Sequence, residues 1–153
     1  MKITDFLSTQ TIIPSLSQRE KTAVLQEMAE AMAANYSNLD PQKVLGVLLE
    51  RERISTTAIG EGVAIPHGKL PGVERVLGVF ARSLQGVDFS SLDGGPTHLF
   101  FVLIAPESAA ADHLKALARI SRLLKDETFR RRLLTGQTGE ELYRIIAEED
   151  DKF

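Results

Sequence analysis

The chain has 153 residues, 43% of them hydrophobic and 25% charged, which is the length and composition of one soluble globular domain. Its net charge of −3 argues against nucleic acid as the main partner, because proteins that bind phosphate backbones usually present a basic face. The absence of cysteine excludes disulfides and thiolate metal sites. The N-terminus lacks the uninterrupted apolar segment of a signal peptide, and no apolar run is long enough to span a bilayer. We therefore expect a cytoplasmic protein without direct membrane insertion.

The first third of the chain is predicted to be helical after a short N-terminal segment. Residues 2–14 are expected to form a helical turn and then a short strand at 11–14. Ser17 and Glu20 have the spacing of a capping box, which predicts that a helix begins there. The apolar residues that follow at helical spacing are expected to be core: Leu25, Met28, Ala29, Met32, Ala33 and Tyr36.

A second helix is predicted to begin at Asp40 and Pro41, since Asp is a favoured N-cap and Pro a favoured first helical residue. Its expected buried side is formed by Val44, Leu45, Leu48 and Leu49. For the charged run 50–53 that closes it, the pattern alone favours a solvent-exposed helix end. Residues 54–62 are rich in Thr, Ser and Gly and predict a loop.

Apolar segments in the middle of the chain predict strands. Their ranges are 63–66, 76–81 and 99–105. The first is bounded by glycines and leads into a turn that presents His67. The last is the most apolar part of the chain and is predicted to be the central strand. Turn signals at 85–86 and 93–96 lie between the second and the third.

The last third is predicted to contain three helices. The first lies near 110–126, and its inward residues are expected to be Leu114, Leu117, Ala118, Ser121 and Leu124. Asp126 is the predicted N-cap of the second, which Gly136 ends, and a capping box at 138–141 opens the third. The acidic residues 148–153 are expected to form a frayed tail. Helices, then strands, then helices predict a single α/β or α+β domain over the whole chain, with a mixed sheet.

Several kinds of functional site are disfavoured by spacing. Five residues separate Gly62 from Gly68, where a P-loop has four, and Leu70 occupies the position of the Mg²⁺-binding hydroxyl. The chain has neither a dinucleotide-binding fingerprint nor a G-x-S-x-G nucleophile elbow. Its three histidines form none of the paired metal-binding motifs, so we expect neither a metal nor a cofactor.

The histidines are the candidates for chemistry. Pattern alone favours a structural or solvent-facing role for His98. It favours a surface position for His113 in the first turn of a helix, although a histidine at a helix N-terminus could donate to a bound phosphate. His67 is presented by its turn, and neutral imidazole offers a free nitrogen near pH 7. A neighbouring cation would lower its pKa and stabilise a transferred phosphoryl group, so phosphoryl transfer is one chemistry open to it.

The segment 51–70 contains R-E-R and, after Ile54, S-T-T-A-I-G-E-G-V-A-I-P-H-G-K-L. It closely resembles the phosphorylation-site motif of IIA domains of the bacterial phosphotransferase system, in the fructose/mannitol class. The P-H-G-K-L ending looks most like the stand-alone nitrogen-regulatory IIA proteins. The resemblance covers essentially the whole chain, including the E-E-L-Y-R-I-I ending. It implies an α/β fold: a three-layer α/β/α domain with a central mixed β-sheet flanked by helices, the mannitol-type IIA fold.

The resemblance also implies the roles of three residues. His67 would accept a phosphoryl group through its Nε2 from a histidine-phosphorylated, HPr-like carrier protein. Arg51 matches the arginine that lies sixteen residues before the histidine in this family. His113, in the sequence H-L-K-A-L, matches the second histidine of the family.

Two functions follow from the resemblance. The first is a phosphohistidine carrier, a phosphotransferase component rather than a free-standing catalyst, that acts mainly as a regulator of partner proteins in nitrogen or metabolic control. A phosphate on His67 would change the charge of a docking surface. The alternative is a IIA component that passes phosphate to a separate sugar-specific IIB component or permease. The expected partners are the HPr-like carrier and either regulated target proteins or a IIB component.

Overall fold

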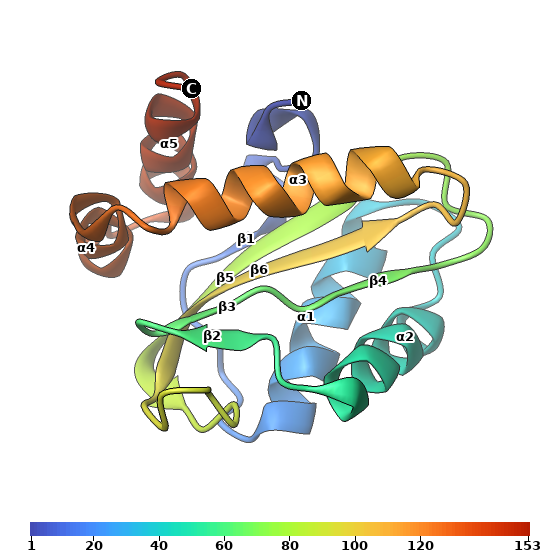
Figure 1. Ribbon diagram of the computed structural model, residues 1–153, viewed down its shortest axis with the longest axis horizontal. Helices are drawn as coiled ribbons and strands as arrows, with labels where there is room; N and C mark the ends of the chain where they lie inside the picture. The colour runs from blue at the N-terminus through green and yellow to red at the C-terminus, as the bar shows by residue number, and fades with distance from the viewer.

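A six-stranded mixed sheet lies between two layers of helices (Figure 1). The computed structural model describes residues 1–153. The strands are β1 (Ile12–Ile13), β2 (Ala58–Gly60), β3 (Val63–Ala64), β4 (His67–Lys69), β5 (Leu77–Val87) and β6 (Thr97–Ala105). They follow the order β1-β5-β6-β3-β2, and β4 also pairs with β6. The β5–β6 and β2–β3 pairs are antiparallel, whereas β1 is parallel to β5, and β3 and β4 are parallel to β6. The predicted α/β fold with a mixed sheet is confirmed.

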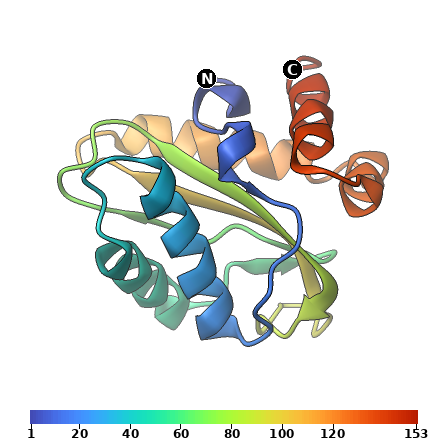
Figure 2. The ribbon, with the colours of Figure 1, turned by 180° about the vertical axis from the view of Figure 1, so that it is seen from behind.

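The helices cover both faces of this sheet. They are α1 (Lys21–Asn35), α2 (Pro41–Ile54), α3 (Ala110–Leu123), α4 (Glu127–Thr135) and α5 (Gly139–Asp150), preceded by the 3₁₀ turns η1 (Ile3–Asp5) and η2 (Thr9–Thr11). Figures 1 and 2 show α1 and α2 on one face and α3 along the other. None of the helices combines the length and the apolar character that a membrane crossing needs. This arrangement confirms the three-layer α/β/α architecture.

Strand β6 belongs to two cores at once. Side chains of a strand alternate between the faces of its sheet. Leu99, Phe101 and Leu103 pack into a cluster of 21 buried residues that includes α3, α4 and α5. Phe100 and Val102 point the other way, into a cluster of 19 buried residues that includes α1 and α2. Both faces are apolar, which explains why the sequence shows a continuous apolar run here, and the predicted central strand is confirmed.

A capping residue was predicted for four of the five helices, and three of these predictions are confirmed. The Asp40 carboxylate accepts from the Gln42 amide, and Pro41 is the first residue of α2. Asp126 caps α4 and Thr138 caps α5, each through its side-chain oxygen. The predicted ends also agree, because α4 stops at Thr135, directly before Gly136. These boundaries depend on groups within a few residues of each other, so local sequence is sufficient to specify them.

The predicted capping box at the start of α1 is wrong. The helix begins at Lys21, and the Glu20 side chain is itself the cap, accepting from the Thr22 amide at 3.2 Å. The amide and hydroxyl of Ser17 instead bond to the carboxylate of Glu27, in the second turn of α1. Glu27 therefore competes successfully for the groups that the capping box needed. The predicted core stripe of this helix is confirmed for Leu25, Met28, Ala29 and Met32, which are fully buried.

Two predicted loops are partly strands. Residues 58–60, within the predicted loop 54–62, form β2 and pair with β3. Strand β5 continues through the predicted turn at 85–86 to Val87. The register with β6 shifts between Arg82 and Val87, and Gly86 has a φ of +87°. The glycine thus permits an irregularity inside a long strand, where the sequence pattern suggested that the strand ends.

The acidic end of the chain, predicted to fray from residue 148, is helical through Asp150. The Asp150 side chain is fully buried and accepts from the guanidinium of Arg119 on α3 and from the amide of Thr4. Glu149 is also buried, and Lys152 lies 3.1 Å from its carboxylate. Charge pairing with distant residues therefore orders a segment whose composition suggests disorder.

We expect Asp150→Ala to lower the free energy of unfolding by about 3 kcal/mol, because it leaves the guanidinium of Arg119 mostly buried without its anion. The matched control is Asp151→Ala, which removes a neighbouring carboxylate that is 73% exposed and pairs with Lys2. That change is expected to lower the free energy of unfolding by less than about 1 kcal/mol. Urea unfolding of the two variants measures the difference, and equal effects would contradict the buried pairing of Asp150.

Candidate functional site

His67 begins a strand, whereas the sequence pattern predicted that it lies in a turn. In β4 it pairs in parallel with Leu103 of β6, and the Leu103 amide donates to the carbonyl of Pro66 at 3.0 Å. Residues 65–66 separate β3 from β4, and both strands pair with β6. His67 is half-buried. The backbone at this residue is thus held by the central strand of the sheet.

The imidazole of His67 is held at both nitrogens. Its Nδ1 lies 2.7 Å from the carbonyl oxygen of Ile65, and its Nε2 lies 3.3 Å from Nε of Arg51. A carbonyl oxygen only accepts and a guanidinium N–H only donates. Nδ1 therefore carries the proton, and Nε2 has the lone pair. The nitrogen with the lone pair is on the side of the ring that faces Arg51.

Helix α2 can bring Arg51 to His67 because Gly68 has no side chain. A Cβ at Gly68 would lie 3.1 Å from Cγ2 of Val47, so a larger residue there would push α2 away from β4. Val47 and Arg51 are four residues apart and share a face of α2. The guanidinium of Arg51 also donates through Nη1 to the carbonyl of Ser55 at 2.9 Å. Pattern alone had favoured a solvent-exposed run at 50–53, but Arg51 is half-buried.

His113 reaches the same place from the opposite layer. It lies in the first turn of α3, it is 5% exposed, and its ring centroid is 5.4 Å from that of His67 at an interplanar angle of 75°. Its Nε2 is buried without a hydrogen-bond partner in the protein. The surface position that the pattern favoured for His113 is wrong.

The error comes from the face of α3 that packs on the sheet. The predicted inward residues included Leu114, which is 68% exposed, whereas the buried residues are His113, Ala116, Ile120 and Leu123. The helix carries apolar residues on two adjacent faces, so its own pattern is ambiguous. Packing against β6 and η1 selects the face that contains His113.

The environment keeps both rings neutral near pH 7. Burial lowers the pKa of His67, and the charge of Arg51 lowers it further, against the opposing effects of the Ile65 carbonyl and the Glu52 carboxylate. Burial lowers the pKa of His113 to about 4, together with the positive charge of Lys69 and the charge that His67 carries once it is protonated at low pH. A neutral His67 with a free lone pair on Nε2 is able to act as a nucleophile.

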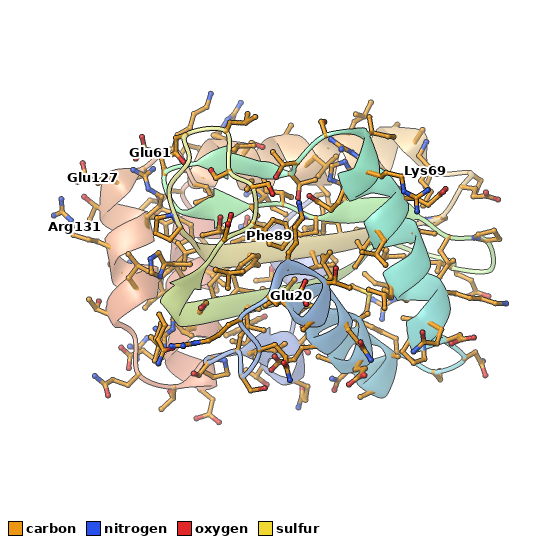
Figure 3. All side chains as sticks on the ribbon, turned by 90° about the horizontal axis from the view of Figure 1, so that it is seen from below. Glu20, Glu61, Lys69, Phe89, Glu127 and Arg131 are labelled. Carbon is orange, nitrogen blue, oxygen red and sulfur yellow. The ribbon has the colours of Figure 1, made fainter.

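These side chains open into a cavity of about 740 Å³ between α2, β4 and the start of α3. Arg51, His67 and His113 all line it, so the structure brings together the three residues that the sequence singled out. Its lining also contains two cations that were not predicted as site residues, Arg53 and Lys69. Figure 3 shows Lys69 beside α2, at the end of the molecule opposite Glu61. Alternate residues of a strand share a face, so Lys69 could have been predicted had 67–69 been recognised as a strand.

The remaining histidine lies elsewhere. His98 contributes to a separate hollow near Glu61 and Arg130, and its Nδ1 lies 2.8 Å from the carbonyl of Ser83. That contact connects β6 to β5, which fits the structural role that the pattern favoured. Nowhere do three or more histidine, aspartate or glutamate side chains meet in a group that could hold a metal ion.

Comparisons with known proteins agree on one family. The family described as "Phosphoenolpyruvate-dependent sugar phosphotransferase system, EIIA 2" matches residues 5–149. A nitrogen regulatory protein of Bradyrhizobium diazoefficiens is 48% identical over 96% of this chain and 95% of its own length. The fructose-specific EIIABC component of Bacillus subtilis is 41% identical over 98% of this chain, which corresponds to 24% of that longer protein. The crystal structure of the nitrogen regulatory protein IIA-Ntr of Neisseria meningitidis superposes with a TM-score of 0.88 at 31% identity, covering 94% of this chain and 98% of the other.

The low pKa of His113 predicts a pH-dependent stability. Between the ordinary pKa of histidine, 6.5, and about 4, the unfolded chain binds a proton at His113 that the folded protein does not. The free energy of unfolding therefore falls as the pH drops through this window, by on the order of 3 kcal/mol in total, and is unaffected by His113 above it. His113→Gln removes this contribution. We expect urea unfolding at several pH values to show the wild type losing stability relative to the variant from pH 7.5 to 4, and parallel curves would contradict the assignment.

Proposed function

We propose a function from one premise: the chain belongs to the EIIA 2 family of the phosphoenolpyruvate-dependent sugar phosphotransferase system, and within it is a homologue of nitrogen regulatory proteins. Our proposal is that His67 accepts a phosphoryl group from a histidine-phosphorylated, HPr-like carrier. The observation that carries it is the orientation of the ring, with Nδ1 bonded to the Ile65 carbonyl and the lone pair of Nε2 directed to the side of Arg51.

The transfer step uses the groups around Nε2. The lone pair of Nε2 forms a bond to phosphorus while the bond between phosphorus and the histidine of the donor breaks, and the donor ring keeps that electron pair. The Nδ1 proton stays on the ring, where the Ile65 carbonyl stabilises the positive charge that develops. The guanidinium of Arg51 exchanges its contact with Nε2 for a phosphoryl oxygen. Positioning and charge neutralisation supply most of the catalysis in such transfers.

His113 is proposed to hold the transferred group. A buried polar nitrogen without a partner costs free energy, and a phosphoryl oxygen on His67 would provide an acceptor for an N–H at Nε2 of His113. With a pKa of about 4 the ring is neutral at physiological pH, so it donates without adding another charge. This arrangement favours the phosphorylated over the free form of His67.

The proposed output is regulation of partner proteins. A relative that is 48% identical over 95% of its own length and a solved structure that superposes over 98% of its chain are both nitrogen regulatory proteins. The mouth of the cavity has exposed apolar side chains, Ile54 and Leu114, beside the cations Arg53 and Lys69. A phosphoryl group would add negative charge at the centre of this surface and thereby change which partner it binds.

The second candidate is delivery of phosphate to a sugar-specific IIB component or permease. The observation that favours it is the similarity to the fructose-specific EIIABC component, in which the matching part is fused to further segments of the same protein. Both candidates use the same phosphohistidine, so they differ only in the protein that meets it.

We expect phosphoenolpyruvate and the general phosphotransfer proteins to label the chain on Nε2 of His67. Mass spectrometry under conditions that avoid acid locates the phosphate, because phosphohistidine is acid-labile. His67→Ala should abolish the labelling. Phosphate on another residue, or undiminished labelling of His67→Ala, would refute the proposal.

The same assay tests the two supporting residues. Arg51→Ala removes the cation at Nε2 and His113→Ala removes the proposed donor, so each should slow the labelling of His67 by roughly 10- to 1,000-fold while the protein stays folded. His98→Ala, outside the cavity, is the control and should retain the wild-type rate. Wild-type rates in both Arg51→Ala and His113→Ala would remove these residues from the site.

Regulation predicts a partner that depends on the phosphorylation state. Immobilised wild-type protein, either phosphorylated or unphosphorylated, should retain different proteins from a cell extract, and His67→Ala should behave as the unphosphorylated form in both preparations. Formation of sugar phosphate with a candidate IIB component or permease, together with identical retained proteins in the two states, would favour the second candidate.

A further inference from the structure

Glu52 follows Arg51 in α2 but is directed away from the cavity, since consecutive helical residues point about 100° apart. Its side chain is 4% exposed. The carboxylate accepts from the amide of Thr57 at 3.0 Å and from the hydroxyl of the same residue, and the ammonium of Lys21 lies 3.1 Å away. A buried carboxylate requires such compensation of its charge. These contacts fix Thr57 against the last turn of α2.

The contact between Glu52 and Thr57 closes a short loop that contains Ser55. Helix α2 ends at Ile54, Ser55 is extended, and β2 begins at Ala58. The carbonyl of Ser55 is the acceptor that holds Nη1 of Arg51. With both ends of the loop 52–57 held together, this carbonyl has little freedom to move. The guanidinium of Arg51 is therefore braced on one side by Ser55 while its Nε faces His67.

The loop is also anchored to the rest of the protein through Phe89. The ammonium of Lys21 donates to the Phe89 carbonyl at 3.3 Å and lies 4.6 Å from the centroid of its ring. The hydroxyl of Thr56 donates to the same carbonyl at 2.9 Å. Lys21 is the first residue of α1 and follows Glu20, which Figure 3 labels together with Phe89. Phe89 in the segment after β5 therefore holds Lys21, the cation that pairs with Glu52. It also holds Thr56, which lies in the loop 52–57.

We propose that Glu52 is a positioning residue for the Arg51–His67 pair, acting through Thr57 and Ser55. The inference rests on the proposed phosphorylation of His67 and adds the group that holds its cation in place. Glu52 touches neither His67 nor the cavity. Its negative charge nevertheless reaches His67, since Glu52 acts to raise the pKa of that ring.

Two substitutions separate the contacts of Glu52 from its charge. Glu52→Ala removes both, and the labelling of His67 should become slower by about 10- to 100-fold, the effect of a small displacement of a catalytic group. Glu52→Gln keeps an acceptor for the Thr57 amide, removes the charge and replaces the oxygen that accepts from the Thr57 hydroxyl with an NH2 group. It should retain most of the maximal rate, while the pH profile of labelling moves to lower pH because the pKa of His67 falls.

The matched control is Glu27→Ala. Glu27 is also a helical glutamate whose carboxylate accepts backbone amides, those of Ser17 and Gln18, but it lies on α1 and outside the loop 52–57. Its loss should reduce stability without changing the rate of labelling or the pH profile. NMR provides a second measurement, since the Arg51 Nε–H resonance should exchange with water faster in Glu52→Ala than in the wild type or Glu27→Ala.

The outcomes distinguish this inference from the proposed function. If the wild type is not labelled on His67, the function itself fails. If the wild type is labelled, then a wild-type rate in Glu52→Ala, or an equal loss in Glu27→Ala, overturns the role of Glu52 alone. Should Glu52→Ala fail to fold, Glu52→Asp decides the question, because it keeps the charge while its shorter side chain draws the carboxylate away from the Thr57 amide. A wild-type rate of labelling in that variant would overturn the positioning role.

Discussion

The close packing of α2 on β4 at Gly68 is the constraint on which the site depends. The missing side chain lets Val47 approach the strand, and Arg51 is one helical turn further along the same face. If α2 were displaced outward by the width of a methyl group, the distance of 3.3 Å between Nε of Arg51 and Nε2 of His67 would be lost. On the other side, the pairing of β4 with β6 keeps His67 from following such a movement. The glycine next to His67 therefore has a packing role.

The site lies where all three layers of the fold meet. Arg51 comes from the helical layer on one face, His113 from the helix on the other, and His67 from the strand between them. Two layers of helices bury the imidazoles in a way that a surface turn could not. Burial and the nearby cations act in the same direction and keep both rings neutral, whereas the Ile65 carbonyl selects the nitrogen that carries the proton. In the proposed transfer, this one arrangement would prepare His67 as the nucleophile and place the positive charge that a phosphoryl group needs.

The position of Arg51 depends on residues outside the cavity. Arg51 is held by a carbonyl in the segment that leaves α2, and a buried glutamate holds that segment to the helix. A guanidinium with a free side chain would sample many rotamers, and ordering it at the moment of transfer would cost conformational entropy. When the segment is ordered in advance, this cost is met during folding and not during the proposed transfer.

The sequence by itself determined what depends on near neighbours. It specified the caps at Asp40, Asp126 and Thr138, the apolar strand β6 and, through a resemblance to a known family, the association of Arg51, His67 and His113. The caps use contacts within a few residues, and the three site residues stand in two family motifs, 51–70 and 113–117, each of which is contiguous in the chain.

Only the tertiary structure decided the features that depend on distant partners. Strand β4 has three residues and is a strand because β6 lies beside it. His113 faces inward because packing selects one of two apolar faces of α3, and Asp150 is ordered because Arg119 and Thr4 reach it from elsewhere. The sequence pattern placed Glu52 in a solvent-exposed charged run, because the pattern does not show its partners Thr57 and Lys21. A charge or an ambiguous face has several local solutions of similar free energy, and long-range contacts select among them.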